Sequence, residues 1–149
     1  MSIITLADFD RFTSGLIGLP AWGVELGDGS FVTVNFGAPS AQDPKCGEFF
    51  LWVYYTAWRI EDPERIVGCY GDEREEMQAA VARLEGKRLL SIEVEGLSLS
   101  ARFEFDDGLV LRTFSIYTTA TEHWALQIPS GQWAVAGPGP VMALVDGDA

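Results

Sequence analysis

Apolar and polar residues alternate with a period of two through much of the second half of the chain. Apolar residues alternate with serine and glutamate over residues 90–95, and the alternation resumes over 97–105 after a glycine. This pattern predicts strands with one buried and one solvent-exposed face. The turn sequence Asp106-Asp107-Gly108 then leads into an apolar run over 109–117. We therefore predict an antiparallel meander of three strands.

Turn residues separate two other pairs of apolar runs. They predict two hairpins, 22–26 with 31–36 around Asp28-Gly29, and 124–128 with 133–136 around Pro129-Ser130-Gly131. The run 49–60 differs from these because Phe, Trp, Tyr and Val occur at both its odd and its even positions, so both parities are apolar. Such a run is typical of a central strand that is covered on both faces.

Two segments have helical signals. Thr5 lies three residues before Asp8, as in a capping box, which predicts a short N-terminal helix that ends by Gly15. A longer helix is predicted over about 72–85, with Asp72 as its N-cap. Its apolar positions form one narrow face: Met77, Ala80, Val81 and Leu84. We expect this helix to pack on one face of the sheet.

The elements together predict a single α+β domain over residues 1–149, dominated by antiparallel sheet. Leu16-x-Gly18 and Leu84-x-Gly86 precede similar pairs of strands, and an offset of 68 residues aligns most of the two segments. Two α-β-β-β units could bury their sheets against each other. The alternative is that short hairpins punctuated by glycine resemble each other by chance.

Composition narrows the classes of function. The chain has 22 acidic and 10 basic residues and a net charge of −12, which argues against binding to nucleic acid or to an anionic membrane. A charged partner should be cationic, although many acidic proteins are merely soluble. The first residues do not resemble a secretory signal, and the two cysteines stand alone. We expect a cytoplasmic protein with reduced thiols and without a membrane span.

The aromatic run supplies the first candidate binding residues. Trp52, Tyr54 and Trp58 share one parity, and Arg59 closes the run. Trp, Tyr and Arg dominate the energetics of protein interfaces. They could line a ligand groove or anchor a protein partner, or they could simply pack in a core strand.

Acidic and titratable residues supply the other candidates. Glu93 and Glu95 share a strand face with Glu104 as a possible neighbour, so they could form a carboxylate patch or the solvated side of the sheet. His123 is the only histidine and could act as a general base, and Cys46 beside Lys45 could have a lowered pKa. No spacing links these two residues, so we predict no catalytic residue, metal or cofactor.

Several segments carry a resemblance to known proteins. The stretches 51–60, 84–87, 97–108 and 122–126 resemble small uncharacterised bacterial proteins, some of which are similar to immunity proteins encoded beside polymorphic toxins. The resemblance implies a binding protein and brings no catalytic residues with it.

The preferred expectation is a non-enzymatic bacterial binding protein, an inhibitor or immunity protein against a cationic partner. The second is a small-molecule-binding or hydrolytic domain with a cleft near Trp52, Trp58 and His123. The third is a homo-oligomeric structural protein that associates through an exposed sheet face or edge.

Overall fold

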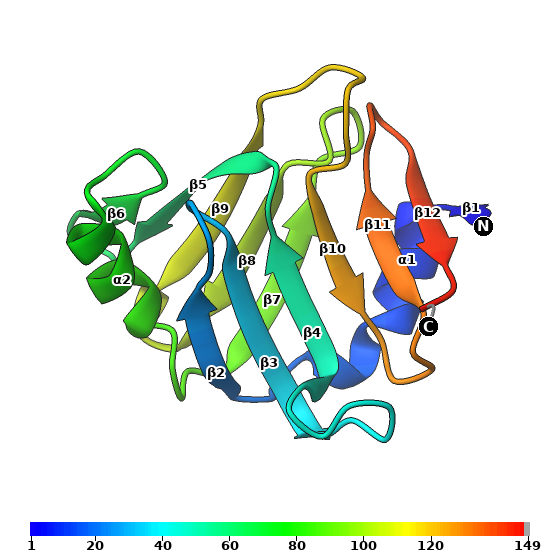
Figure 1. Cartoon of the computed structure of the whole chain (residues 1–149), viewed down its shortest axis with the longest axis horizontal. Coiled ribbons are helices and arrows are strands. Elements are labelled where there is room, and N and C mark those ends of the chain that lie inside the picture. The colour runs from blue at the N-terminus through cyan, green and yellow to red at the C-terminus, as the bar shows by residue number, and fades with distance from the viewer. Residues whose placement is uncertain (148–149) are drawn as a thin grey trace.

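Twelve β-strands form two antiparallel sheets in the computed structural model, which describes residues 1–147 (Figure 1). The seven-stranded sheet has the order β1-β12-β11-β10-β4-β3-β2, and the five-stranded sheet has the order β6-β5-β9-β8-β7. The elements are β1 (Ser2–Ile4), α1 (Leu6–Phe12), the 3-10 helix η1 (Ser14–Leu16), β2 (Ala21–Leu26), β3 (Val32–Pro39), β4 (Gly47–Val53), β5 (Thr56–Glu61), β6 (Ile66–Cys69), α2 (Arg74–Ala82), β7 (Leu89–Val94), β8 (Ala101–Phe105), the 3-10 turn η2 (Asp106–Gly108), β9 (Val110–Ser115), β10 (Trp124–Gln127), β11 (Trp133–Ala136) and β12 (Met142–Val145). The predicted α+β class with mainly antiparallel sheet is confirmed.

The predicted hairpins are present. Strand β2 pairs with β3, β7-β8-β9 form the meander, and β10 pairs with β11. Strands β1 and β12 were not predicted, because three and four residues are too short to establish an alternation. They pair with each other and extend the seven-stranded sheet beyond β11.

The run 49–60 is not one central strand. Strand β4 belongs to the seven-stranded sheet and β5 to the five-stranded sheet, and the chain crosses between them at Tyr54 and Tyr55. The buried parity changes at this crossing, from Leu51 and Val53 in β4 to Trp58 and Ile60 in β5. The prediction of a strand covered on both faces is therefore wrong. The core lies on opposite sides of the chain before and after the crossing, and the outward parity of β4 is apolar as well because it carries Phe50 and Trp52.

The helices differ in how well their ends were predicted. In α1 the capping box is confirmed, since Thr5 Oγ1 accepts from Asp8 N and Thr5 N donates to Asp8 Oδ2, both at 3.0 Å. Helix α2 begins after Glu73, which makes no side-chain cap. The predicted cap, Asp72, instead accepts from Cys69 N at 2.9 Å in the preceding turn.

The predicted apolar face of α2 is buried, including Leu84 just beyond the helix. Its place in the fold differs from the prediction. Helix α2 contacts β2 and β6, the edge strands of the two sheets, so it closes the gap between them rather than covering a sheet face (Figure 1). Helix α1 buries Phe9 against Trp124, with ring centroids 5.7 Å apart, and lies beside β7.

The two sheets repeat one arrangement. Strands β2-β3-β4 continue into β10-β11 in the first sheet, and β7-β8-β9 continue into β5-β6 in the second. Each half of the chain thus gives three strands to its own sheet and the next two to the sheet of the other half. Each half also begins with a helix, α1 before β2 and α2 before β7.

Backbone hydrogen bonds between the halves follow the same symmetry. Gly18 N donates to Leu89 O and Gly86 N donates to Ala21 O, both at 2.7 Å, and a shift of 68 residues makes these two bonds equivalent. The same shift relates the bond from Ala21 N to Lys87 O (2.8 Å) to the bond from Leu89 N to Leu19 O (3.0 Å). An isolated bridge joins Pro20 to Arg88, which are themselves related by that offset. The fold therefore has an internal two-fold pseudo-symmetry whose axis passes near this bridge.

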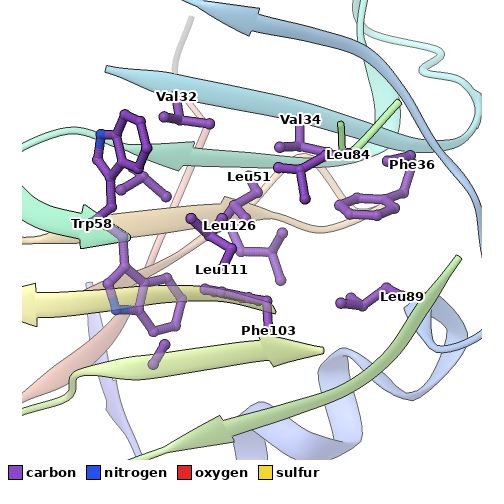
Figure 2. Close-up of a cluster of buried hydrophobic side chains, with 14 of the residues drawn as sticks. Val32, Val34, Phe36, Leu51, Trp58, Leu84, Leu89, Phe103, Leu111 and Leu126 are labelled. Atoms are coloured by element: carbon purple, nitrogen blue, oxygen red, sulfur yellow. The ribbon is translucent and has the colours of Figure 1, made fainter. Parts of the chain in front are cut away.

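The core lies between the sheets and is also symmetric. Phe36 of β3 stacks on Phe105 of β8 with centroids 6.3 Å apart. Trp58 donates from Nε1 to Ser30 O at 2.7 Å, and Trp124 donates to Leu99 O at 2.9 Å. Figure 2 shows apolar side chains from the strands of both sheets in this shared interior.

Candidate functional site

The predicted aromatic residues separate in the structure. Trp58 is 1% exposed in the core, whereas Trp52 is half-buried on the outer face of the seven-stranded sheet. Tyr54 is buried beside Trp52, and their rings stack with centroids 4.3 Å apart. Trp52 and Trp58 lie on different sheets, and the hollow that His123 lines, beside Leu97 and Pro140, includes neither tryptophan, so the structure does not bring the three residues of the predicted cleft together.

A larger cluster of aromatic rings surrounds Trp52. We call it the aromatic face and define it as Phe31, Phe50, Trp52, Tyr54 and Trp133. Trp133 lies 6.4 Å from Trp52 and 5.9 Å from Phe50 between ring centroids, and Phe31 lies 6.3 Å from Trp52. No helix crosses the outer side of β3, β4 and β10, which faces the viewer in Figure 1.

Three members of the aromatic face were missed from the sequence. Phe50 shares the outward parity of Trp52 within β4, but the apolar run 49–60 carries no sequence signal for the end of β4. Trp133 reaches the cluster only because β10 pairs with β4, which brings residues far apart in sequence together. Phe31 begins the predicted strand 31–36 but lies just before β3, and nothing in its local sequence shows that its ring reaches Trp52.

The strands that carry the aromatic face are acidic, although Lys45 of the β3–β4 loop lines a hollow together with Phe50. The seven strands of its sheet, all within the described chain, contain no Lys or Arg, and their only charged residues are Glu25 and Glu48. Burial, and then the nearby carboxylate of Glu122, raise the pKa of the Tyr54 phenol well above its usual range. The surroundings therefore favour a cationic group over an anionic one.

The outer face of the five-stranded sheet is built differently. Arg59, Arg112 and Arg102 lie side by side in register on β5, β9 and β8. Glu61 accepts from Arg59 Nε at 2.6 Å and from Arg112 Nε at 3.2 Å. Although burial acts in the opposite direction, these two guanidinium groups hold the pKa of Glu61 below its usual value. The Arg59 guanidinium also lies 5.0 Å from the centroid of the Phe114 ring.

The three predicted glutamates lie on this second face among the arginines. Glu104 accepts from Arg102 Nη1 at 3.2 Å, and Glu93 pairs in register with Arg102. Glu95 accepts from Ser98 Oγ at 2.9 Å in the following loop. The carboxylates are thus interleaved with cations. Over residues 1–147, no three His, Cys, Asp or Glu side chains are arranged to hold a metal ion.

His123 is a buried residue at the start of β10. Its Nδ1 lies 2.8 Å from Ser115 Oγ, and Ser115 Oγ donates to Ser98 O at 2.7 Å. Because the hydroxyl hydrogen is used by Ser98 O, Nδ1 is the donor and Nε2 is a lone-pair acceptor. Nε2 has no hydrogen-bond partner and lies against Gly137, where a Cβ would approach it to 2.8 Å.

Cys46 does not combine with His123. His123 O accepts from Tyr54 N at one end of β4, whereas Cys46 precedes the other end of that strand. Burial and the neighbouring carboxylate of Asp43 raise the pKa of the Cys46 thiol, which is opposite to the effect expected from Lys45. The structure therefore brings no thiolate and general base together here.

The burial of His123 predicts a pH dependence of stability. Burial lowers the pKa of its imidazole, although Glu122 acts in the opposite direction. The unfolded state therefore binds a proton more readily, and stability should fall as the pH drops below about 6.5, the ordinary histidine value, until it passes the lower folded pKa. Urea unfolding at pH 7.5 and 5.5 should show a larger loss for the wild type than for His123→Gln. An equal loss in both proteins would contradict this assignment, because the acidic residues contribute alike to both.

A groove lies at one end of the aromatic face. Its volume is about 790 Å³, and Phe50 and Trp133 line it together with Asp43, Asp146, Gln127 and Gln132. It is bounded by the β3–β4 loop, the β10–β11 turn and the chain that follows β12.

Comparisons of the chain with protein-family models, with curated proteins and with solved structures gave no match. Neither helix described over residues 1–147 is long and apolar enough to cross a membrane.

Proposed function

We propose that this chain is a non-enzymatic binding protein that captures a cationic protein on its aromatic face. One observation carries the proposal. On the outer face of the seven-stranded sheet, Thr33, Trp52 and Ala125 lie side by side in register on β3, β4 and β10. The internal pseudo-symmetry places them at the positions that Arg102, Arg112 and Arg59 occupy on β8, β9 and β5 of the five-stranded sheet. The same frame thus accommodates a charged face, so the fold itself does not require an aromatic one.

The distribution of charge supports a cationic partner. Seven of the basic residues form ion pairs with acids of the same chain, among them the three arginines of the five-stranded sheet. The strands of the aromatic face contain acids and no bases. A partner that offers Arg or Lys next to apolar side chains would match both properties.

An inhibitor or immunity protein would use such a face without any catalytic group, in agreement with the resemblance noted in the sequence. It acts by covering its partner, and tight covering depends on a few large aromatic anchors near the centre of the interface. Trp52 is the central ring of the face, since it contacts Phe31, Tyr54 and Trp133.

Trp52→Thr should therefore weaken binding of a cationic peptide by about tenfold or more, the effect of losing an interface anchor. The probe is a short synthetic peptide that alternates Arg with Leu, and its counterpart alternates Glu with Leu. Binding is measured by titration calorimetry at low and high salt. The affinity of the wild type for the Arg-Leu peptide should fall as salt screens the charges.

Leu97→Thr is the matched control, because Leu97 is an apolar side chain that is 83% exposed and lies outside the aromatic face. It should leave the affinity unchanged. Equal binding of the Glu-Leu peptide, or equal affinities of the wild type and Trp52→Thr, would overturn the proposal. A dimer in sedimentation that is lost in Trp52→Thr would instead support self-association through this face.

A further inference from the structure

The groove beside the aromatic face combines flat aromatic walls with unpaired carboxylates. Phe50 and Trp133 meet at an interplanar angle of 86° with centroids 5.9 Å apart. Asp43 and Asp146 line the same groove, and neither forms an ion pair within the described chain. No Lys or Arg lines it. The groove thus offers both ring faces and negative charge.

Hydrogen bonding leaves the groove rich in acceptors. Gln127 Nε2 donates to Gly131 O at 3.0 Å, and Gln132 Nε2 donates to Asp146 Oδ1 at 3.3 Å. The hydroxyl of Ser130 donates to Gln132 Oε1 at 3.1 Å. These donors are therefore partly or wholly used inside the protein.

The two carboxylates keep most of their capacity. Asp146 accepts from Gln132, and Asp43 accepts from Lys45 N at 3.1 Å and weakly from Cys46 Sγ at 3.7 Å. A carboxylate can accept about four hydrogen bonds. Acceptor sites on both residues are consequently free for a ligand that supplies donors.

We propose that this groove binds the guanidinium group of an arginine side chain on the captured protein, an inference that rests on the proposed function. Guanidinium carries five donors and no acceptor, is planar, and stacks on aromatic rings. It can therefore lie on Trp133 or Phe50 while it donates to Asp43 or Asp146. On the other sheet of this chain, Arg59 already lies over Phe114 and donates to Glu61 in the same manner.

The test uses N-acetyl-arginine amide as the probe and N-acetyl-citrulline amide as its uncharged analogue of nearly the same shape. Binding is followed by NMR through the indole N–H signal of Trp133. The arginine probe should shift this signal, and the citrulline probe should not. The double variant Asp43→Asn/Asp146→Asn should weaken binding by about tenfold or more, because neither residue then offers a carboxylate for a charge-assisted hydrogen bond.

Glu93→Gln/Glu95→Gln is the matched control, since it removes two negative charges outside the groove and should leave the affinity within about twofold. Thermal unfolding of each variant checks that it is folded. An equal loss in the two double variants would overturn the inference, because only the overall charge would then matter. The inference would also be overturned if the citrulline probe shifted the Trp133 signal as much as the arginine probe does. The same holds if maltose shifted this signal and the arginine probe did not.

The Arg-Leu peptide separates this inference from the proposed function. If its affinity falls in Trp52→Thr but not in Asp43→Asn/Asp146→Asn, the aromatic face binds the partner and the groove does not hold its arginine. If the peptide does not bind the wild type, the proposed function itself is overturned. A loss of peptide affinity in both variants supports the proposed function and this inference together.

Discussion

Replacement of Trp124 with alanine should lower the free energy of unfolding by about 3–5 kcal/mol, as expected when a large buried ring is truncated. Trp124 is 0% exposed, and its ring makes edge contacts with Phe9 and Phe103, each at 5.7 Å between centroids. The change would also leave Leu99 O without its indole donor. Urea denaturation monitored by circular dichroism measures the loss.

The pseudo-symmetry supplies a second test of the same prediction. Trp58 has the equivalent place in the other half, with 1% exposure and its own bond to Ser30 O, so Trp58→Ala should cost a similar amount. Trp133→Ala should cost clearly less, because Trp133 is half-buried on the outer face. A loss below about 1 kcal/mol for Trp124→Ala, which is the range of ordinary substitutions, would contradict the assigned packing.

Local signals in the sequence were sufficient for the hairpins. Asp28-Gly29 and Asp106-Asp107-Gly108 do lie in tight turns between paired strands, because turn chemistry acts over a few residues. Period-two alternation also placed Phe103 and Phe105 correctly in the core. It failed at Leu90, which is 42% exposed because the pairing of β7 is irregular directly after Leu89.

The sheet to which each strand belongs could not be predicted in the same way. The change of sheet between Val53 and Thr56 depends on pairing with β10 and β9, which lie more than fifty residues later in the chain. A run of large apolar residues is compatible with either sheet. The edge position of α2 follows from the same long-range arrangement. For this reason its buried residues were predicted correctly and its location was not.

The candidate site was predicted only in part. Trp52 and Tyr54 belong to the aromatic face, whereas Trp58 contributes to the core. Residue type alone could not separate them. Both tryptophans are at even positions, but even positions face outward in β4 and face the core in β5. The interleaving of Glu104 with Arg102 likewise depends on the register of β8 and its neighbours.

The repeat explains why one outer face can vary independently of the other. Inward positions in both halves are mostly apolar, as in Val34 of β3 and Phe103 of its counterpart β8. Outward positions are constrained only by solubility and by strand propensity. One of the outer faces carries paired arginines and glutamates, and the other carries the aromatic face. The shared frame does not by itself prescribe this difference, and capture of a partner is the demand that we propose for it.

Leu84→Ala should destabilise the fold by about 2–4 kcal/mol, since a buried leucine leaves a cavity when it is truncated. Leu84 is 0% exposed where the chain leaves α2, and Leu16 is its equivalent at 1% exposure in the first half. Both residues precede a glycine that donates across the pseudo-symmetry axis, so Leu16→Ala should cost a similar amount. Leu97→Ala, at an 83% exposed position, is the matched control and should change the free energy of unfolding by less than about 0.5 kcal/mol. Urea unfolding of the three variants measures these differences. A loss for Leu84→Ala as small as that for Leu97→Ala would show that the junction between the two halves is not packed as described.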